Sequence, residues 1–194
     1  MPEEPQRRRT VARTLVVAWF VAMTAISAVL LGRHLLAFPQ PADDAGQLRT
    51  LASDTRVMSV VHVLYAQCRC SQRIVDHLVT SERPHGVVET VLLVGDDDGA
   101  AARLVAHGFR VVTTTVDELG SRWRVTAVPL LVVIAPGGRV RYVGGYAARK
   151  QGPDPQDLAI IAIARGEGRL SSLPVYGCAV AGEVAERLGA KGVF

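Results

Sequence analysis

The sequence predicts an α/β fold with a central mixed sheet flanked by helices, preceded by a single N-terminal transmembrane helix. Two observations lead to this prediction. Residues 14–31 contain no charged side chain, and later in the chain short β-branched runs alternate with segments of helical periodicity. The elements follow the order strand, helix, strand, helix, strand, then a two-stranded hairpin and a helix. This order predicts parallel pairing, with antiparallel strands added by the hairpin.

Residues 14–31 are long enough to cross a membrane. As a helix they would span roughly 27 Å at about 1.5 Å per residue, close to the ~30 Å hydrocarbon core. Four arginines precede the segment and one follows it closely, so the positive-inside rule places residues 1–13 in the cytoplasm. We therefore expect a single-pass signal-anchor in the cytoplasmic membrane, with the soluble domain facing the periplasm or the cell exterior.

A cleaved signal peptide is the alternative for this segment. Signal peptides have a shorter apolar region, about 7–15 residues, that ends in a small-x-small cleavage site. Here such a pattern, Ala25-Ile26-Ser27, lies inside the apolar run. The sequence therefore favours an uncleaved anchor.

The remaining chain divides into a linker, a domain and an extension. Residues 38–46, with two prolines, two aspartates and a glycine, are typical of a linker. Residues 47–165 are predicted to form one domain with its own core, and residues 166–194 a C-terminal extension that contains Cys178. The net charge is +4, with no basic block interleaved with aromatic residues. We therefore expect no nucleic acid partner.

The pattern of apolar residues sets the individual elements. Strands are predicted at 57–66, 87–94, 109–114, 130–135 and 139–143, and helices at 47–54, 71–81, 100–107, 116–123, 155–165 and about 179–188. Ser71 is the expected N-cap of the helix over 71–81. Pro136-Gly137-Gly138 predicts the hairpin turn.

Cys68 and Cys70 form the most informative motif, a Cys-Arg-Cys sequence between the first strand and the following helix. A helix N-terminus carries partial positive charge and free N–H groups, which stabilise a thiolate. Thiol pairs exported from the cytoplasm can be oxidised. The pattern indicates redox chemistry, with a metal site and two unpaired thiols as the alternatives. Cys178 leaves an odd number of cysteines.

Residues 57–165 resemble the thioredoxin-like superfamily. The resemblance is carried by cysteines after the first strand, a βαβ unit, the stretch from Ala127 to Tyr146 that places Val128-Pro129 before the hairpin, and a closing helix. With the N-terminal segment, the chain is similar to membrane-tethered extracytoplasmic thiol-disulfide oxidoreductases. The resemblance implies a redox-active centre that acts on protein thiols or disulfides.

The resemblance also implies roles for four residues. Cys68 takes the place of the attacking thiol and Cys70 that of the resolving thiol, although one residue separates them where the family has two. Pro129 takes the place of a cis-proline that faces the cysteines. His62, six residues before Cys68, takes the place of a buried acidic residue that helps to move a proton. A hydrogen-bonded core histidine is the alternative interpretation of His62.

The alternative function is binding or delivery of Cu(I) on the same fold. Thiolates favour this ion, and Cys68, Cys70 and Cys178 would be the ligands. For the oxidoreductase we expect no cofactor. A scaffold whose thiols no longer turn over is a weaker alternative.

Three structural expectations follow. The Val128–Pro129 bond should be cis and near the cysteines. Cys68 should be the more exposed thiol and Cys70 the more buried one. Cys178 is expected to be a packing residue. The alternative is a third thiol beside Cys68 or Cys70, where a disulfide would need Cα atoms about 4.4–6.8 Å apart.

Overall fold

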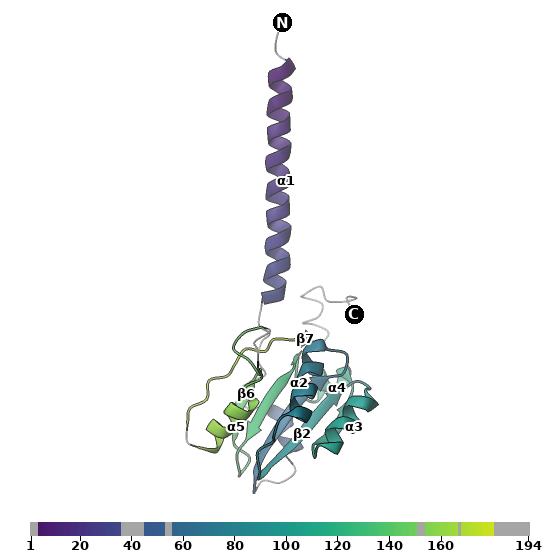
Figure 1. Cartoon of the computed structure of the whole chain (residues 1–194), viewed down its shortest axis with the longest axis vertical. Coiled ribbons are helices and arrows are strands. Elements are labelled where there is room, and N and C mark those ends of the chain that lie inside the picture. The colour runs from purple at the N-terminus through teal and green to yellow at the C-terminus, as the bar shows by residue number, and fades with distance from the viewer. Residues whose placement is uncertain (1–3, 36–44, 53–55, 151–153, 167, 181–194) are drawn as a thin grey trace. The chain divides into compact units, whose positions relative to one another are not determined.

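The computed structural model describes residues 4–35, 45–52, 56–150, 154–166 and 168–180 (Figure 1). The chain divides into two compact units, Met1–Leu36 and Ala37–Phe194. Helix α1 (Glu4–Leu35) makes up most of the first unit. Its stretch Val11–Val29 is long and apolar enough to cross a membrane, and the side chains in that stretch are exposed. The apolar segment predicted at 14–31 thus lies within a continuous helix.

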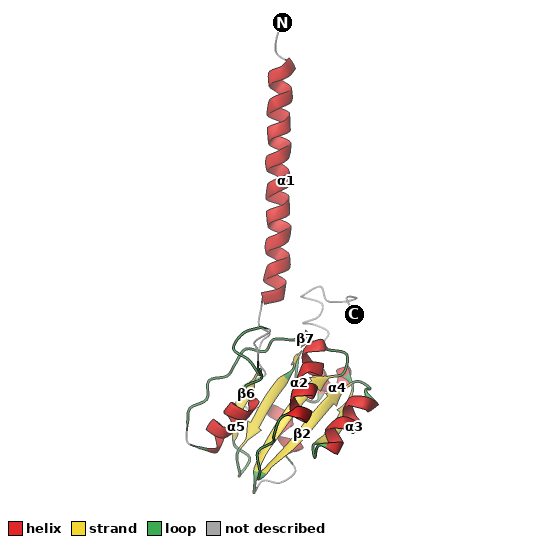
Figure 2. Cartoon of the chain, viewed as in Figure 1, coloured by secondary structure: helices red, strands yellow, loops and turns green. Residues whose placement is uncertain are grey.

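A five-stranded mixed sheet forms the centre of the second unit (Figure 2). Its strands are β1 (Met58–Tyr65), β2 (Val87–Val94), β3 (Arg110–Thr114), β5 (Leu130–Ile134) and β6 (Val140–Gly144). The order across the sheet is β3-β2-β1-β5-β6. β1, β2 and β3 pair in parallel, whereas β5 runs antiparallel to both β1 and β6. The predicted combination of parallel strands and an antiparallel hairpin is confirmed.

Helices cover both faces of this sheet. Three helices pack on one face: α2 (Arg69–Thr80), α3 (Asp98–Ala106) and α5 (Asp157–Arg165). The other face is covered by the 3-10 helix η1 (Gly46–Leu51) and by α4 (Val116–Ser121). Because β1 is central, its side chains alternate between two cores: Val61 and Val63 enter one, and Val60 and Leu64 the other. This buried strand ends at the cysteines.

A second, two-stranded sheet involves the C-terminal extension. β4 (Ala127–Val128) lies just before β5, and β7 (Cys178–Ala179) pairs antiparallel with it. The helix predicted at about 179–188 is therefore wrong at its start, because Ala179 is extended. The rest of that prediction, from residue 181, lies outside the described residues, as do residues 38–44 of the predicted linker.

The start of α2 also differs from the prediction. The N-cap is Cys68 and not Ser71, so Cys70 belongs to the first helical turn. The Ser71 hydroxyl is instead used across the loop, where it accepts a hydrogen bond from the Tyr65 backbone N–H at 3.0 Å. This bond ties the end of β1 to α2. It leaves Cys68 at the junction between the two elements.

Candidate functional site: thiols beside a cis-proline

The site begins with Cys68, which the end of β1 delivers to the N-terminus of α2. Its backbone N–H donates to the Tyr65 carbonyl at 3.0 Å, and its own carbonyl accepts from the Gln72 N–H at 2.9 Å. These bonds fix the cysteine backbone in a tight turn followed directly by helix. The Cys68 side chain is only 1 % exposed, whereas Cys70 is partly exposed. The predicted order of exposure is therefore wrong.

Cys68 is buried because it forms a disulfide with Cys178. The two Cα atoms are 6.2 Å apart, and 110 positions separate the residues in sequence. Cys70 is a free thiol. The expectation that Cys178 only packs is wrong: the extension returns to the start of α2 and supplies a third thiol to the site. Sequence spacing gave no sign of this pairing, because the contact depends on where the extension runs.

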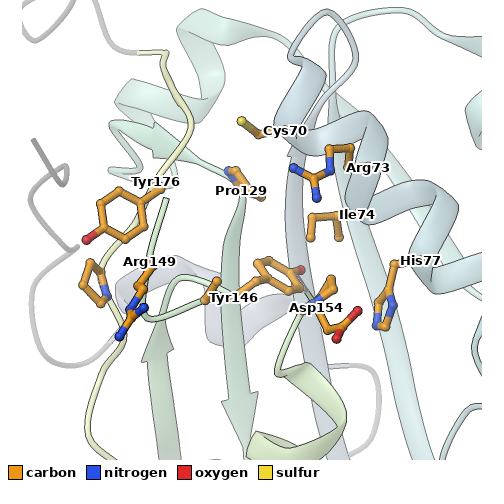
Figure 3. Close-up of a pocket in the computed structure, with 12 residues that line it drawn as sticks. Cys70, Arg73, Ile74, His77, Pro129, Tyr146, Arg149, Asp154 and Tyr176 are labelled. Atoms are coloured by element: carbon orange, nitrogen blue, oxygen red, sulfur yellow. The ribbon is translucent and has the colours of Figure 1, made fainter. Parts of the chain in front are cut away.

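Pro129 lies on the other side of the cysteines. The Val128–Pro129 bond is cis, as predicted. Pro129 and Cys70 line one pocket of about 270 Å³, shown in Figure 3. Pro174 and Tyr176 of the extension line the same pocket. The predicted proximity of Pro129 to the thiols is confirmed by this shared pocket.

The pocket has a basic and aromatic character. Arg73 and His77 from α2 contribute to one side, and Arg149 and Asp154 come from the segment before α5. Figure 3 shows the Tyr146 ring between Arg149 and Asp154, below Pro129. The free Cys70 thus lines a pocket that it shares with charged and aromatic side chains.

His62 lies in the core below this pocket and is fully buried on β1. Its Nδ1 is 2.7 Å from the Tyr146 hydroxyl, and its Nε2 is 2.9 Å from Glu89 Oε2. Because an ionised Glu89 can only accept, we assign the ring proton to Nε2, and Tyr146 then donates to Nδ1. His62 is connected to the pocket through Tyr146.

Glu89 extends these contacts into a buried network. The Arg83 guanidinium donates to Glu89 through Nε at 3.0 Å and also through Nη2, and its Nη1 donates to Asp157 Oδ2 at 2.8 Å. Asp157 Oδ1 lies 2.8 Å from His77 Nε2. One arginine thus bridges two carboxylates, and a histidine contacts each of them. The network runs from β1 to the pocket-lining face of α2.

Burial and hydrogen bonding act in opposite directions on this network. Burial alone would raise the pKa of Glu89, but the hydrogen bonds from His62 and Arg83 outweigh it and lower the pKa from 4.5 to about 2. Burial raises the pKa of Tyr146 well above its usual value of 10, so its hydroxyl stays protonated. Glu89 is therefore an anion and Tyr146 a neutral donor across the physiological range.

The structure brings together Cys68, Cys178 and Cys70 near Pro129. His62 does not line the pocket but is hydrogen-bonded to Tyr146, which does. Sequence reasoning missed the network around Glu89, although one signal was present. Glu89 is the single charged residue in the mostly apolar strand 87–94, and a buried charge needs a partner.

No family model matches the chain, and no curated protein does. Among solved structures, an uncharacterized conserved protein from Geobacillus kaustophilus is 16 % identical with a TM-score of 0.51, over 65 % of this chain and 77 % of that one. A hypothetical protein from Sinorhizobium meliloti 1021 is 17 % identical with a TM-score of 0.52, over 76 % and 91 %. A secreted Mycobacterium tuberculosis disulfide oxidoreductase is 15 % identical with a TM-score of 0.43, over 60 % and 86 %.

The first two likenesses concern the fold alone. The features of the chain itself agree with the resemblance seen in its sequence. Its mixed sheet has the order β3-β2-β1-β5-β6, and a cysteine stands at the junction of the first strand and helix. A cis-proline precedes β5 and shares a pocket with the second cysteine. These features identify a thioredoxin-like fold.

Proposed function

We propose that the protein is a membrane-anchored extracytoplasmic thiol-disulfide oxidoreductase that exchanges disulfides with protein partners through Cys68. The observation that carries the proposal is the Cys68–Cys178 disulfide at the N-terminus of α2, with a free Cys70 thiol two residues away. A disulfide beside a third thiol is arranged for exchange, because exchange proceeds by attack of a thiolate on a disulfide sulfur.

The surroundings of the thiols support this function. Cys68 caps α2 and Cys70 lies in its first turn, where the helix dipole stabilises negative charge on sulfur. Cys70 is partly exposed and lines a pocket of about 270 Å³, at which a partner would approach it. His62 and Tyr146 supply a buried hydrogen bond below the pocket, and a proton passed to or from a thiol would travel through it.

The N-terminal helix supports the location. Val11–Val29 is apolar, exposed and of sufficient length to span a bilayer. The excess of arginine before it supports a thiol domain outside the cytoplasm. A disulfide in that domain fits an oxidising compartment.

A redox titration tests the proposal. Full-length protein in detergent is equilibrated in glutathione buffers, alkylated and analysed by mass. We expect a reversible two-electron couple that includes Cys68, together with reduction or oxidation of a model protein disulfide such as that of insulin. Cys68→Ser should abolish both. A couple that is absent between the fully reduced and fully oxidised buffers would refute the proposal.

Cu(I) binding is a second candidate, because Cys178 joins Cys68 at the site. Among the described residues, no group of three or more His, Cys, Asp and Glu side chains is placed to hold a metal ion. Copper would therefore need the disulfide to be reduced first, and Cys68 and Cys178 would then offer two thiolates. Stoichiometric protection of these thiols by Cu(I) during alkylation would favour the carrier over the enzyme.

A further inference from the structure

The extension is attached to the domain by its backbone as well as by its disulfide. The Gly145 N–H donates to the Leu173 carbonyl at 2.9 Å, and the Leu173 N–H donates to the Tyr142 hydroxyl at 3.2 Å. Further along, Cys178 and Ala179 pair with Val128 and Ala127 in an antiparallel ladder. Residues 173–180, which we name the strap, therefore follow the edge of the domain from β6 to β4.

Gly177 allows the strap to approach the cis-proline. A Cβ atom built on Gly177 would lie 1.9 Å from the Val128 carbonyl oxygen and 2.6 Å from Pro129 Cδ. Such distances cannot occur without moving one backbone away from the other. The strap thus contacts the residue pair at the cis bond directly, backbone against backbone, and only glycine fits there.

The strap also hides the sulfur that partners must reach. Cys68 is 1 % exposed, and Val175 and Val180 of the strap are buried in the core on the η1 side of the sheet. Cys70 and Cys178 are partly exposed as residues. A partner that needs Cys68 therefore meets a domain whose exchange position is already occupied.

We infer that the strap is a tethered internal substrate: it occupies, as an extended segment bonded to Cys68 through Cys178, the edge at which a cysteine-bearing polypeptide segment would dock. This inference rests on the proposed function. The occupant has the chemistry expected of such a partner: an extended backbone paired to Ala127–Val128, a small residue against Pro129, and a cysteine bonded to Cys68. Partners compete with the strap for the same edge.

Opening needs only internal exchange. The Cys70 thiolate attacks Sγ of Cys68, the Cys68–Cys70 bond forms, and the Cys68–Cys178 bond breaks. Cys178 leaves as a thiolate and takes up the proton that Cys70 released. No electrons are gained or lost, so no external oxidant or reductant is required. The product exposes β4 and carries its disulfide between the two residues at the start of α2.

Disulfide mapping of the oxidised full-length protein in detergent measures this equilibrium. Trypsin cleaves after Arg69, so peptides that contain Cys68 and Cys70 separate unless a disulfide joins them. We compare the wild type with Gly177→Ala, which should raise the ratio of the Cys68–Cys70 form to the Cys68–Cys178 form about tenfold, the factor set by about 1.4 kcal/mol. Gly166→Ala is the matched control, because a Cβ there has no neighbour closer than 3.7 Å.

A peptide of sequence PVYGCAV, copied from residues 174–180, tests the docking edge itself. It is offered as an activated mixed disulfide to reduced Cys178→Ser protein, which has no strap cysteine. We expect capture on Cys68 about tenfold faster than for the same peptide with alanine in place of its glycine. Equal capture of the two peptides, together with an unchanged Gly177→Ala ratio, would overturn the inference.

The two proposals fail in different ways. Suppose that Cys178→Ser protein exchanges readily with glutathione disulfide, while Gly177→Ala in the protein and alanine for glycine in the peptide have no effect. The strap then has a structural role alone, and only this inference is lost. If Cys178→Ser protein exchanges with no disulfide at all, the proposed function itself is wrong. Cys70→Ser adds a third arm: it should leave the oxidised protein in the Cys68–Cys178 form even with Gly177→Ala.

Discussion

At the scale of single residues, Glu89 connects the candidate site to the core. Its carboxylate sits between His62 and Arg83, and both are buried or nearly so. Removing one partner of such a group leaves an uncompensated charge, which typically costs 3–5 kcal/mol. The contacts of Glu89 with His62 and Arg83 are therefore needed to hold β1 and β2 together near the thiols.

The lowered pKa of Glu89 predicts a pH dependence of stability. Its pKa is about 2 in the folded protein against 4.5 for the ordinary group. The ionised form is favoured by folding, so its contribution is complete above pH 4.5 and is lost as pH falls from 4.5 to about 2. The difference corresponds to on the order of 3 kcal/mol. Denaturant unfolding across this range should show the loss, and Glu89→Gln should be less stable at pH 7 and flatter below pH 4.5.

Tyr146→Phe removes one hydroxyl and leaves Nδ1 of His62 without its partner. We expect the free energy of unfolding to fall by about 1–3 kcal/mol, the cost of an unsatisfied buried polar group. If His62 exchanges protons with the thiols through Tyr146, the pH profile of Cys70 alkylation should also shift. An unchanged profile with lowered stability would leave His62 as a core histidine.

At the scale of elements, the strap links the C-terminal extension to the rest of the domain. The disulfide joins the end of β1 to β7 across 110 residues, and the ladder with β4 adds backbone hydrogen bonds. A bond that closes so long a loop restricts the unfolded chain strongly. The extension therefore contributes to stability beyond the contacts that its side chains make.

Cys178→Ser should lower the free energy of unfolding of the oxidised protein by about 2–5 kcal/mol. Urea unfolding of the full chain in detergent measures it. Cys70→Ser is the control, since that residue is not in the bond and should change stability little. A reductant should bring wild type and Cys178→Ser together. A difference that survives reduction would show that the serine, not the missing bond, is responsible.

The elements also show what the sequence could reveal. The apolar runs gave β1, β2 and β5 within a residue or two, because buried parallel and central strands are continuously apolar. The cis bond before β5 followed from the Val128-Pro129 pair in its family context. The N-cap of α2 was misplaced, since Cys68 rarely signals a cap while Ser71 does. β7 could not be found from two residues whose strand conformation depends on a distant partner.

At the scale of the whole molecule, the chain combines an apolar helix with a domain that carries its chemistry. The thiols, Pro129 and the buried network all belong to residues after position 44. The helix is long and apolar enough to cross a membrane. Trp19 and Phe20 are among the exposed apolar side chains of this helix.

The full chain should therefore remain in the membrane fraction after alkaline extraction. Phe20→Arg, near the middle of Val11–Val29, should shift part of it to the soluble fraction, because a central arginine costs about 2.5–3.5 kcal/mol on insertion. Leu15→Ile is a matched apolar control. In intact spheroplasts, a membrane-impermeant maleimide should label Cys70 before the membrane is lysed. Labelling only after lysis would place the domain in the cytoplasm.

The distance in sequence between Cys68 and Cys178 has a consequence for biogenesis. Synthesis proceeds from the N-terminus, so Cys68 and Cys70 are translated together, and Cys178 follows 110 residues later. Until it arrives, the only partner for Cys68 within the same chain is Cys70. The bond to Cys178 can form only after β2 through β6 have been delivered, because they lie between the two cysteines. The Cys68–Cys178 disulfide can therefore be present only in chains whose translation has passed β2 to β6 and reached Cys178.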